Sequence, residues 1–194
     1  MKKIIIVAVF SLSLLYFNCS AQNIASLEKF GGTLNIGTGI GGYSGYYGYI
    51  GHAMPVFHID YESDMVKNFT LAPFVNLYTY SNGYYRSISC NPDIPKEYFT
   101  YHETVIPVGA KGTYYFDKLL NAGSKWDFSV SGSLGIAIIN SSWTSGYDGE
   151  TTYFHSSNPL FLDVHVGTEY HMNKTLGIFV DISSGVSTIG LAIH

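Results

Sequence analysis

The chain has 194 residues, of which 46% are hydrophobic and 12% are charged, with a formal net charge of −4. The charged share is about half of that in soluble domains. So few charges exclude a disordered chain, a nucleic-acid binder and a coiled coil, because each needs a charged surface. Mean hydropathy is +0.14, yet no apolar run reaches the roughly 18 residues of a spanning helix. Such a chain, with 17 Tyr and 21 Gly, is typical of a membrane β-barrel.

The first 21 residues have the features of a secretory signal peptide. Lys2 and Lys3 precede an apolar stretch over residues 4–17, and small residues flank the expected cleavage after Ala21. Two alternatives are a buried helix or anchor, and a lipoprotein acylated at Cys19. An asparagine precedes this cysteine, where a lipoprotein signal carries a small residue.

Removal of this segment changes what can hold the exported chain together. The net charge becomes −6 with the loss of two lysines, and Cys90 is left without an intrachain disulfide partner. The chain must then be held by core packing or by closure of a sheet. We expect residues 22–32 to form an N-terminal periplasmic segment and residues 33–194 to form the folded domain.

Period-two alternation predicts eight strands in that domain. The clearest segment is 126–138, where Val130, Leu134 and Ile136 share one face and Ser129 and Ser131 share the other. The predicted strands are 33–41, 55–61, 69–80, 102–116, 126–138, 160–172, 175–182 and 186–194.

The composition of the two faces distinguishes a membrane barrel from a soluble sandwich, which also alternates. One face carries small and polar residues that fit a narrow interior, and the other carries large aliphatic residues almost without charge. We therefore expect lipid on the aliphatic face. Because an open sheet edge cannot lie in hydrocarbon, eight strands must close into a barrel, whose interior is just wide enough for side chains to fill.

Connections of alternating length support the same fold. Segments 42–52, 81–99 and 140–157 are long, whereas 62–67, 117–124 and 172–174 are short. Long external loops and short periplasmic turns produce this pattern, although the seventh connection, 183–185, is short where an external loop is expected.

Aromatic residues of the aliphatic face gather at the level of the predicted periplasmic turns. This clustering indicates an aromatic girdle at the membrane interface, and ordinary cross-strand pairing is the alternative. The girdle residues are Tyr61, Tyr114, Phe116, Trp126 and Tyr170.

The stretch from Ile106 to Phe116, followed by Lys125-Trp126-Asp127 and a strand rich in serine and glycine, resembles small eight-stranded outer-membrane barrels of the porin family. Residues 167–170 and 189–191 resemble their last strands, and the likeness covers roughly residues 33–194. It implies an outer-membrane location in a Gram-negative cell envelope and insertion by the barrel-insertion machinery. Such chains commonly end in Phe, whereas this sequence ends in His194.

The predicted inward face collects ten titratable residues, of which Lys111 is the only Lys or Arg. We interpret them as a polar lumen network in which Lys111 pairs with carboxylates. A metal or proton site formed by His58, His165 and His171 with a carboxylate is the alternative. The ten residues are His58, Asp60, Glu103, Lys111, Asp127, Asp163, His165, Glu169, His171 and Asp181.

Two further features bear on function. An enzyme acting on lipid needs an outward nucleophile and base, and the predicted outward face offers only His102 and Thr104 near the external rim, with no Ser–His–acid set. A Tyr-rich external loop is a candidate binding surface, which contains Tyr43, Tyr46, Tyr47 and Tyr49.

The sequence thus predicts an all-β, eight-stranded antiparallel up-and-down transmembrane barrel with a filled polar lumen. We expect a monomeric, non-enzymatic outer-membrane protein without a cofactor or nucleic-acid partner. Its predicted role is structural or interactive, through long external loops that contact an unidentified extracellular ligand. The alternatives are a narrow passive channel for small solutes and a soluble periplasmic barrel that binds an apolar ligand.

Overall fold

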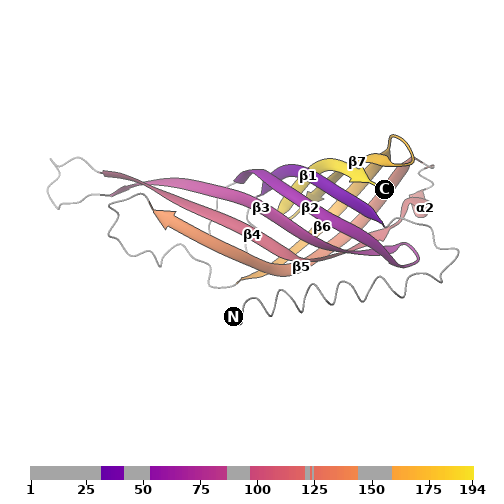
Figure 1. Cartoon of the computed structure of the whole chain (residues 1–194), viewed down its shortest axis with the longest axis horizontal. Helices are drawn as coiled ribbons and strands as arrows, with labels where there is room; N and C mark the ends of the chain where they lie inside the picture. The colour runs from indigo at the N-terminus through magenta and orange to yellow at the C-terminus, as the bar shows by residue number, and fades with distance from the viewer. Residues whose placement is uncertain (1–31, 42–52, 87–96, 121–122, 124, 144–158) are drawn as a thin grey trace.

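The computed structural model describes residues 32–41, 53–86, 97–120, 123, 125–143 and 159–194. These residues form a closed antiparallel barrel in which each strand pairs with its sequence neighbours and β1 pairs with β8 (Figure 1). The predicted eight-stranded up-and-down barrel is therefore confirmed. In chain order, the elements are β1 (Thr33–Gly41), β2 (Ala53–Val66), β3 (Phe69–Arg86), β4 (Glu97–Tyr115), α2 (Asp117–Leu120), β5 (Trp126–Trp143), β6 (Leu160–His171), β7 (Leu176–Ser183) and β8 (Val186–Ile193).

The two ends of the barrel differ in their connections. We call the end with the β2–β3, β4–β5 and β6–β7 connections the turn end, and the opposite end the loop end. At the turn end, Asn68 adopts a positive φ of 60° in the two-residue turn between β2 and β3, a conformation that asparagine tolerates and tight hairpins need. The β4–β5 connection, predicted as a turn over 117–124, contains the short helix α2.

Several strands continue past their predicted ends toward the loop end. β3 and β4 stay paired from Phe69–Tyr114 to Arg86–Glu97, so residues 81–86 and 97–99 of the predicted 81–99 loop are strand. Residues 140–143, predicted to begin another loop, belong to β5. In Figure 1, the β3–β4 pair projects well beyond the shorter β7 and β8. The sequence prediction was wrong here because loop-like composition does not prevent two strands from pairing.

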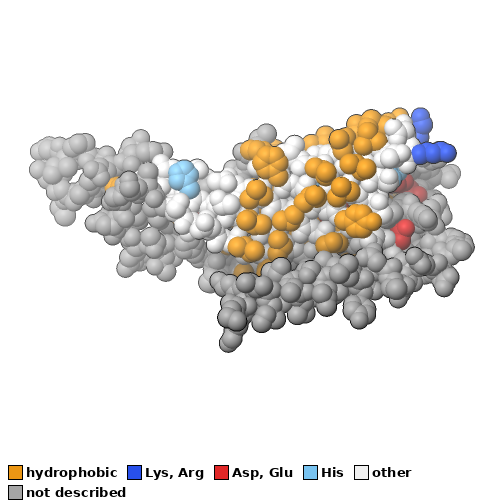
Figure 2. All heavy atoms as spheres, in the orientation of Figure 1, with side chains coloured by type: hydrophobic (Ala, Val, Ile, Leu, Met, Phe, Trp, Pro, Cys, Tyr) orange, Lys and Arg blue, Asp and Glu red, His pale blue; other side chains and the backbone are white. Residues whose placement is uncertain are grey.

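The outer surface of the barrel is apolar around its middle. Val164 and Ile182 are 65% and 66% exposed, and most strands contribute aliphatic residues to this belt. Figure 2 shows the belt crossing the barrel, with charged side chains gathered at one end. An uncharged aliphatic belt around a closed barrel is the surface of a transmembrane barrel. No helix among the described residues is long and apolar enough to cross a membrane.

The loop-end half of the interior contains an apolar layer, which consists of Val56, Phe74, Phe161 and Val186, with Tyr78 packed against it. The rings of Phe74 and Phe161 lie 5.7 Å apart although β3 and β6 are three strands apart. The contact therefore crosses the lumen. The lumen, predicted to be filled and polar, is therefore not polar throughout, because inward positions of four strands in this half carry aromatic or branched apolar side chains.

Two glycines allow β4 and β5 to approach each other closely at one point of the barrel. Gly109 of β4 and Gly135 of β5 are direct cross-strand partners. A Cβ atom added to Gly135 would lie only 2.9 Å from the Cα atom of Gly109. The pair thus permits tight curvature of the barrel, and a larger residue at either position would push the two strands apart.

Candidate functional site

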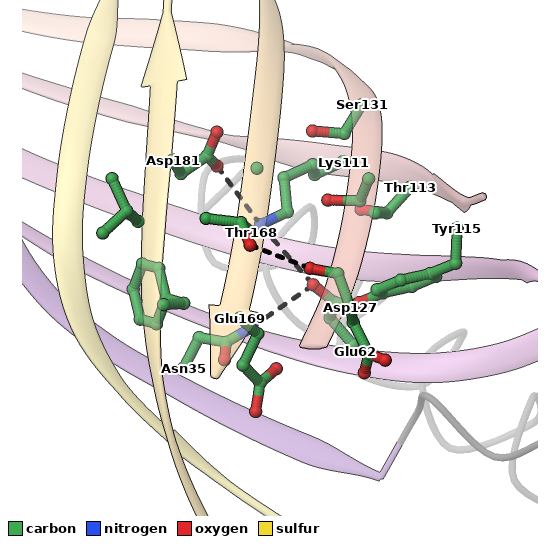
Figure 3. A pocket seen from close by; sticks show the side chains of 14 residues that line it. Asn35, Glu62, Lys111, Thr113, Tyr115, Asp127, Ser131, Thr168, Glu169 and Asp181 are labelled. Atoms are coloured by element: carbon green, nitrogen blue, oxygen red, sulfur yellow. Dashed lines mark hydrogen bonds and ion pairs between the residues drawn. The ribbon is translucent and has the colours of Figure 1, made fainter. Parts of the chain in front are cut away.

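Lys111 lies at the centre of a buried ion cluster in the turn-end half of the lumen. Its ammonium group forms an ion pair with Asp60 and lies 3.6 Å from Glu62 and 3.9 Å from Asp181. The three carboxylates come from β2 and β7, and Lys111 comes from β4. Because β4 and β7 are three strands apart, this cluster also crosses the lumen. Figure 3 shows Lys111 pointing between Asp181 and Glu62.

Among the three carboxylates, Asp60 lies closest to Lys111. Besides Lys111, it accepts a hydrogen bond of 2.7 Å from the amide of Asn35 and lies 2.9 Å from Nε2 of His58. The other ring nitrogen of His58 is 2.6 Å from the side-chain oxygen of Asn76. The side chain of Asp60 is fully buried, so this charge is retained in the interior by its partners.

Glu62 belongs to the same network, although the sequence analysis placed it in a turn. It accepts hydrogen bonds from Thr70 at 2.7 Å and from the phenol of Tyr115 at 2.6 Å. The alternation of inward residues along β2 continues through Glu62, two residues after Asp60. Extending the period-two pattern by one step would have found it.

A small pocket of about 30 Å³ adjoins this cluster at the turn end. Its lining includes Lys111, Glu62, Asp127, Glu169 and Asp181 (Figure 3). This volume is that of about one water molecule. The walls of the pocket carry carboxylate, ammonium and hydroxyl groups, which suit water or a small cation.

His165 continues the network from the ion cluster toward the loop end. It is hydrogen-bonded to Ser133 at 2.9 Å, and its two ring nitrogens lie 3.3 Å from Asp181 and 3.6 Å from Asp163. A single imidazole thus lies between two carboxylates. His58, in contrast, lies between one carboxylate, that of Asp60, and the side-chain oxygen of Asn76, and His171 contacts other partners. Among the described residues, these three histidines do not form a metal-binding group.

Asp163 holds the β7–β8 turn at the loop end. Its carboxylate accepts hydrogen bonds from the hydroxyls of Ser183 and Ser184, at 2.9 and 2.7 Å, and from the backbone N–H groups of Gly185 and Val186, at 2.8 and 2.9 Å. The turn is therefore folded over a buried charge. This explains why the seventh connection is short where the sequence pattern led us to expect a longer loop.

The other four predicted lumen residues lie on either side of the Lys111 cluster along the barrel. Glu103 is buried on β4 toward the loop end, where it accepts a hydrogen bond from the phenol of Tyr101. Asp127, Glu169 and His171 lie at the turn end, and His171 is 2.7 Å from Asp127. The ten residues are thus spread along the length of the interior and do not form one site.

The predicted girdle residues lie near the turn end. Tyr61, Tyr114 and Trp126 are 46%, 45% and 43% exposed, and the rings of Trp126 and Tyr170 are 4.9 Å apart. Phe116 follows the end of β4, where its backbone N–H donates to Phe128. An interfacial role for these aromatic residues stays a prediction. The predicted binding-loop tyrosines, between residues 42 and 52, lie outside the described residues.

The outward face near the loop end contains a serine–histidine pair that the sequence analysis missed. The hydroxyl of Ser81 lies 2.8 Å from Nδ1 of His102, and both residues are exposed. The sequence predicts a loop at Ser81, but the extension of β3 places this residue opposite His102. Within the described part of the chain, no carboxylate contacts His102 as the acid of a hydrolytic triad would.

No protein-family model and no curated protein matches this chain. Among solved structures, it is similar to the outer membrane protein Ail of Yersinia pestis. The backbone structure of Ail in a phospholipid bilayer nanodisc is 12% identical, with 83% of this chain and 96% of that one covered and a TM-score of 0.42. The crystal structure of Ail in complex with the heparin analogue sucrose octasulfate is 9% identical, with coverages of 83% and 97% and a TM-score of 0.42. At this distance, the likeness concerns the fold alone.

Proposed function

We propose that this protein is a non-enzymatic barrel of the bacterial outer membrane, with a closed lumen and a surface-interaction role at its loop end. The observation that carries the proposal is the pair of contacts that cross the lumen. Phe74 meets Phe161 in the apolar layer, and Lys111 meets Asp60 and Asp181 in the polar layer. A solute would have to displace both layers to pass.

The outer surface supports the membrane location. A belt of aliphatic residues without charge is stable against hydrocarbon but costly in water. With export by the predicted signal peptide, the turn end faces the periplasm and the loop end faces outward. A soluble ligand-binding barrel is disfavoured because the bulky apolar residues lie outside and the charged residues lie inside.

The projecting β3–β4 pair supports a role in surface interaction. On β3 and β4, the apolar belt ends at a row of polar outward residues on the side of the loop end. These residues are Thr79, Ser81, His102 and Thr104. From Thr79 to Arg86, the strand continues for roughly 23 Å at the usual rise per residue. A paired ribbon of this length extends past the apolar belt, which supports contact with a partner outside the membrane.

Planar-bilayer conductance tests the closed lumen. We expect no conductance steps from the wild-type protein or from Lys111→Ala, because the apolar layer still blocks the lumen. The double variant Lys111→Ala/Phe74→Ala lacks one obstructing side chain in each layer, so we expect it to produce conductance steps. Phe57→Ala, on the outward face, is the matched control and should stay silent. Steps from the wild-type protein would favour a narrow passive channel.

Protease treatment of intact cells tests the orientation. Cleavage within residues 87–96 or 144–158, with protection of the short connections at the turn end, is the expected result. Cleavage only after the outer membrane is permeabilised would place the loop end in the periplasm and contradict the surface role.

A further inference from the structure

Three side chains from β6 and the end of β8 meet across β7 at the turn end. Gly177 of β7 pairs with His171 on one side and with Ala192 on the other. A Cβ atom added to Gly177 would lie 2.9 Å from Cδ of Glu169. The glycine therefore leaves the space that the Glu169 carboxylate occupies, and through this space Glu169 reaches His194.

The contacting atoms are those that bind metal ions. Oε1 of Glu169 is 2.7 Å from Nε2 of His194 and 3.6 Å from Nδ1 of His171. One ligand atom from each of these residues lies within 4.8 Å of the other two. Ligand atoms around a tetrahedral zinc ion are about 3.4 Å apart, given bonds of about 2.0–2.1 Å. The Glu169–His194 contact is shorter than this spacing and the Glu169–His171 contact is slightly longer.

The other nitrogen of each imidazole is already held by an outer partner. Nε2 of His171 lies 2.7 Å from the carboxylate of Asp127, and Nδ1 of His194 lies 2.9 Å from the hydroxyl of Thr33. The backbone N–H of His194 also donates to Thr175 at 2.9 Å. A carboxylate on the outer nitrogen of a metal-binding histidine fixes the ring and its tautomer, and the Thr33 hydroxyl holds the His194 ring in place.

In one pair of imidazole tautomers, this arrangement leaves three electron-pair donors facing one another. With their outer nitrogens protonated, His171 and His194 present lone pairs toward the negatively charged Glu169. A proton on His194 satisfies one of these contacts, whereas a divalent cation satisfies all three. The geometry points to a binding site for a divalent transition-metal ion, formed by Glu169, His171 and His194, with Asp127 as the outer carboxylate.

The donor set and the charge around it define the class of ion. Two imidazoles and a carboxylate suit zinc, copper or nickel, whereas magnesium and calcium prefer sites composed only of oxygen. Asp127 and Glu169 also border the pocket of about 30 Å³, which has room for a water molecule as a fourth ligand. Bound there, the ion would link β6 to the end of β8, next to the β1–β8 pairing that closes the barrel.

Isothermal titration of the full-length, tag-free protein in detergent micelles with ZnCl₂ tests this site, with MgCl₂ as the comparison ion. We expect one Zn²⁺ per chain and no heat of binding from Mg²⁺. His171→Gln and His194→Gln should each raise the Kd at least about tenfold, and Asp127→Asn should raise it about 10- to 100-fold. Gly177→Ala should also weaken binding, because its methyl group displaces the Glu169 carboxylate.

His102→Gln is the matched control, since this histidine lies on the outward face of β4. Each variant is first checked for folding by its heat-modifiable migration on a detergent gel. Failure of the wild-type protein to bind Zn²⁺ would overturn the proposal, and so would unchanged affinity in folded His171→Gln and His194→Gln. A loss of affinity in His102→Gln equal to theirs would place the ion elsewhere.

Discussion

The two faces of β6 have opposite environments although their residues alternate along one strand. Phe161, Asp163 and His165 point inward and are at most 7% exposed. Val164 and Val166 point outward and are 65% and 60% exposed. In a soluble barrel, the aliphatic residues would be buried and the charged residue would face water. Their reversal here indicates that the medium around the barrel is less polar than its interior.

The inward face should be the more sensitive of the two, and Lys111→Met tests it most strongly. The substitution leaves Asp60, Glu62 and Asp181 without their shared cation, and the loss of one partner from a buried ion cluster costs about 3–5 kcal/mol. Urea unfolding from lipid vesicles, followed by tryptophan fluorescence, measures the change in the free energy of unfolding. Lys174→Met, at an exposed turn position, is the control and should change it by less than about 0.5 kcal/mol. Equal effects from the two variants would contradict a cross-lumen ion cluster.

Val164→Arg tests the outward face. An arginine on the lipid-facing surface destabilises a membrane barrel by about 2–4 kcal/mol at the midplane and by less toward the interfaces, whereas an exposed position on a soluble barrel would tolerate it. Thr175→Arg, in the exposed β6–β7 turn, is the matched control and should have little effect. The same vesicle unfolding assay applies. If Val164→Arg is as stable as the wild-type protein, the belt does not face hydrocarbon.

Asp163→Asn tests how the inward face supports the loop end. The amide keeps one acceptor oxygen and loses the charge, so some of the hydrogen bonds from the β7–β8 turn must break. We expect a loss of about 2 kcal/mol, in the range for unsatisfied partners of a charged group. Ser183→Ala removes a single donor and should cost about 1 kcal/mol. Hydrogen exchange at the Gly185 and Val186 amides should accelerate in Asp163→Asn, and unchanged protection would exclude this anchoring role.

The division into faces could be predicted from the sequence because period-two alternation depends only on strand geometry. The alternation along 126–138 and 160–172 predicts which residues face inward and which face outward. Together with the requirement that the sheet close on itself, it predicts the barrel fold. The contacts across the lumen could not be predicted in this way. That Phe74 meets Phe161, or that Lys111 meets Asp181, depends on the stagger of strands three positions apart, which the pattern of one strand does not contain.

Strand ends were the other feature that the sequence did not reveal. Residues 81–86 have the composition of a loop, yet their pairing with 97–102 makes them strand. This extension brings Ser81 to His102, and the continuation of β2 brings Glu62 to Lys111. The contact between His194 and Glu169 could not be predicted from a strand pattern either. It is possible because the strand between them, β7, has a glycine at position 177, which leaves room for the Glu169 carboxylate.

The central claim is that the apolar belt faces lipid, and extraction of the membrane fraction tests it most directly. After an alkaline carbonate wash of cell envelopes without detergent, we predict that the protein stays with the outer-membrane pellet. It should then dissolve only in detergent, and there migrate on a gel as a compact form that converts to a slower form on boiling. Release into buffer by the carbonate wash, without detergent, would contradict the account.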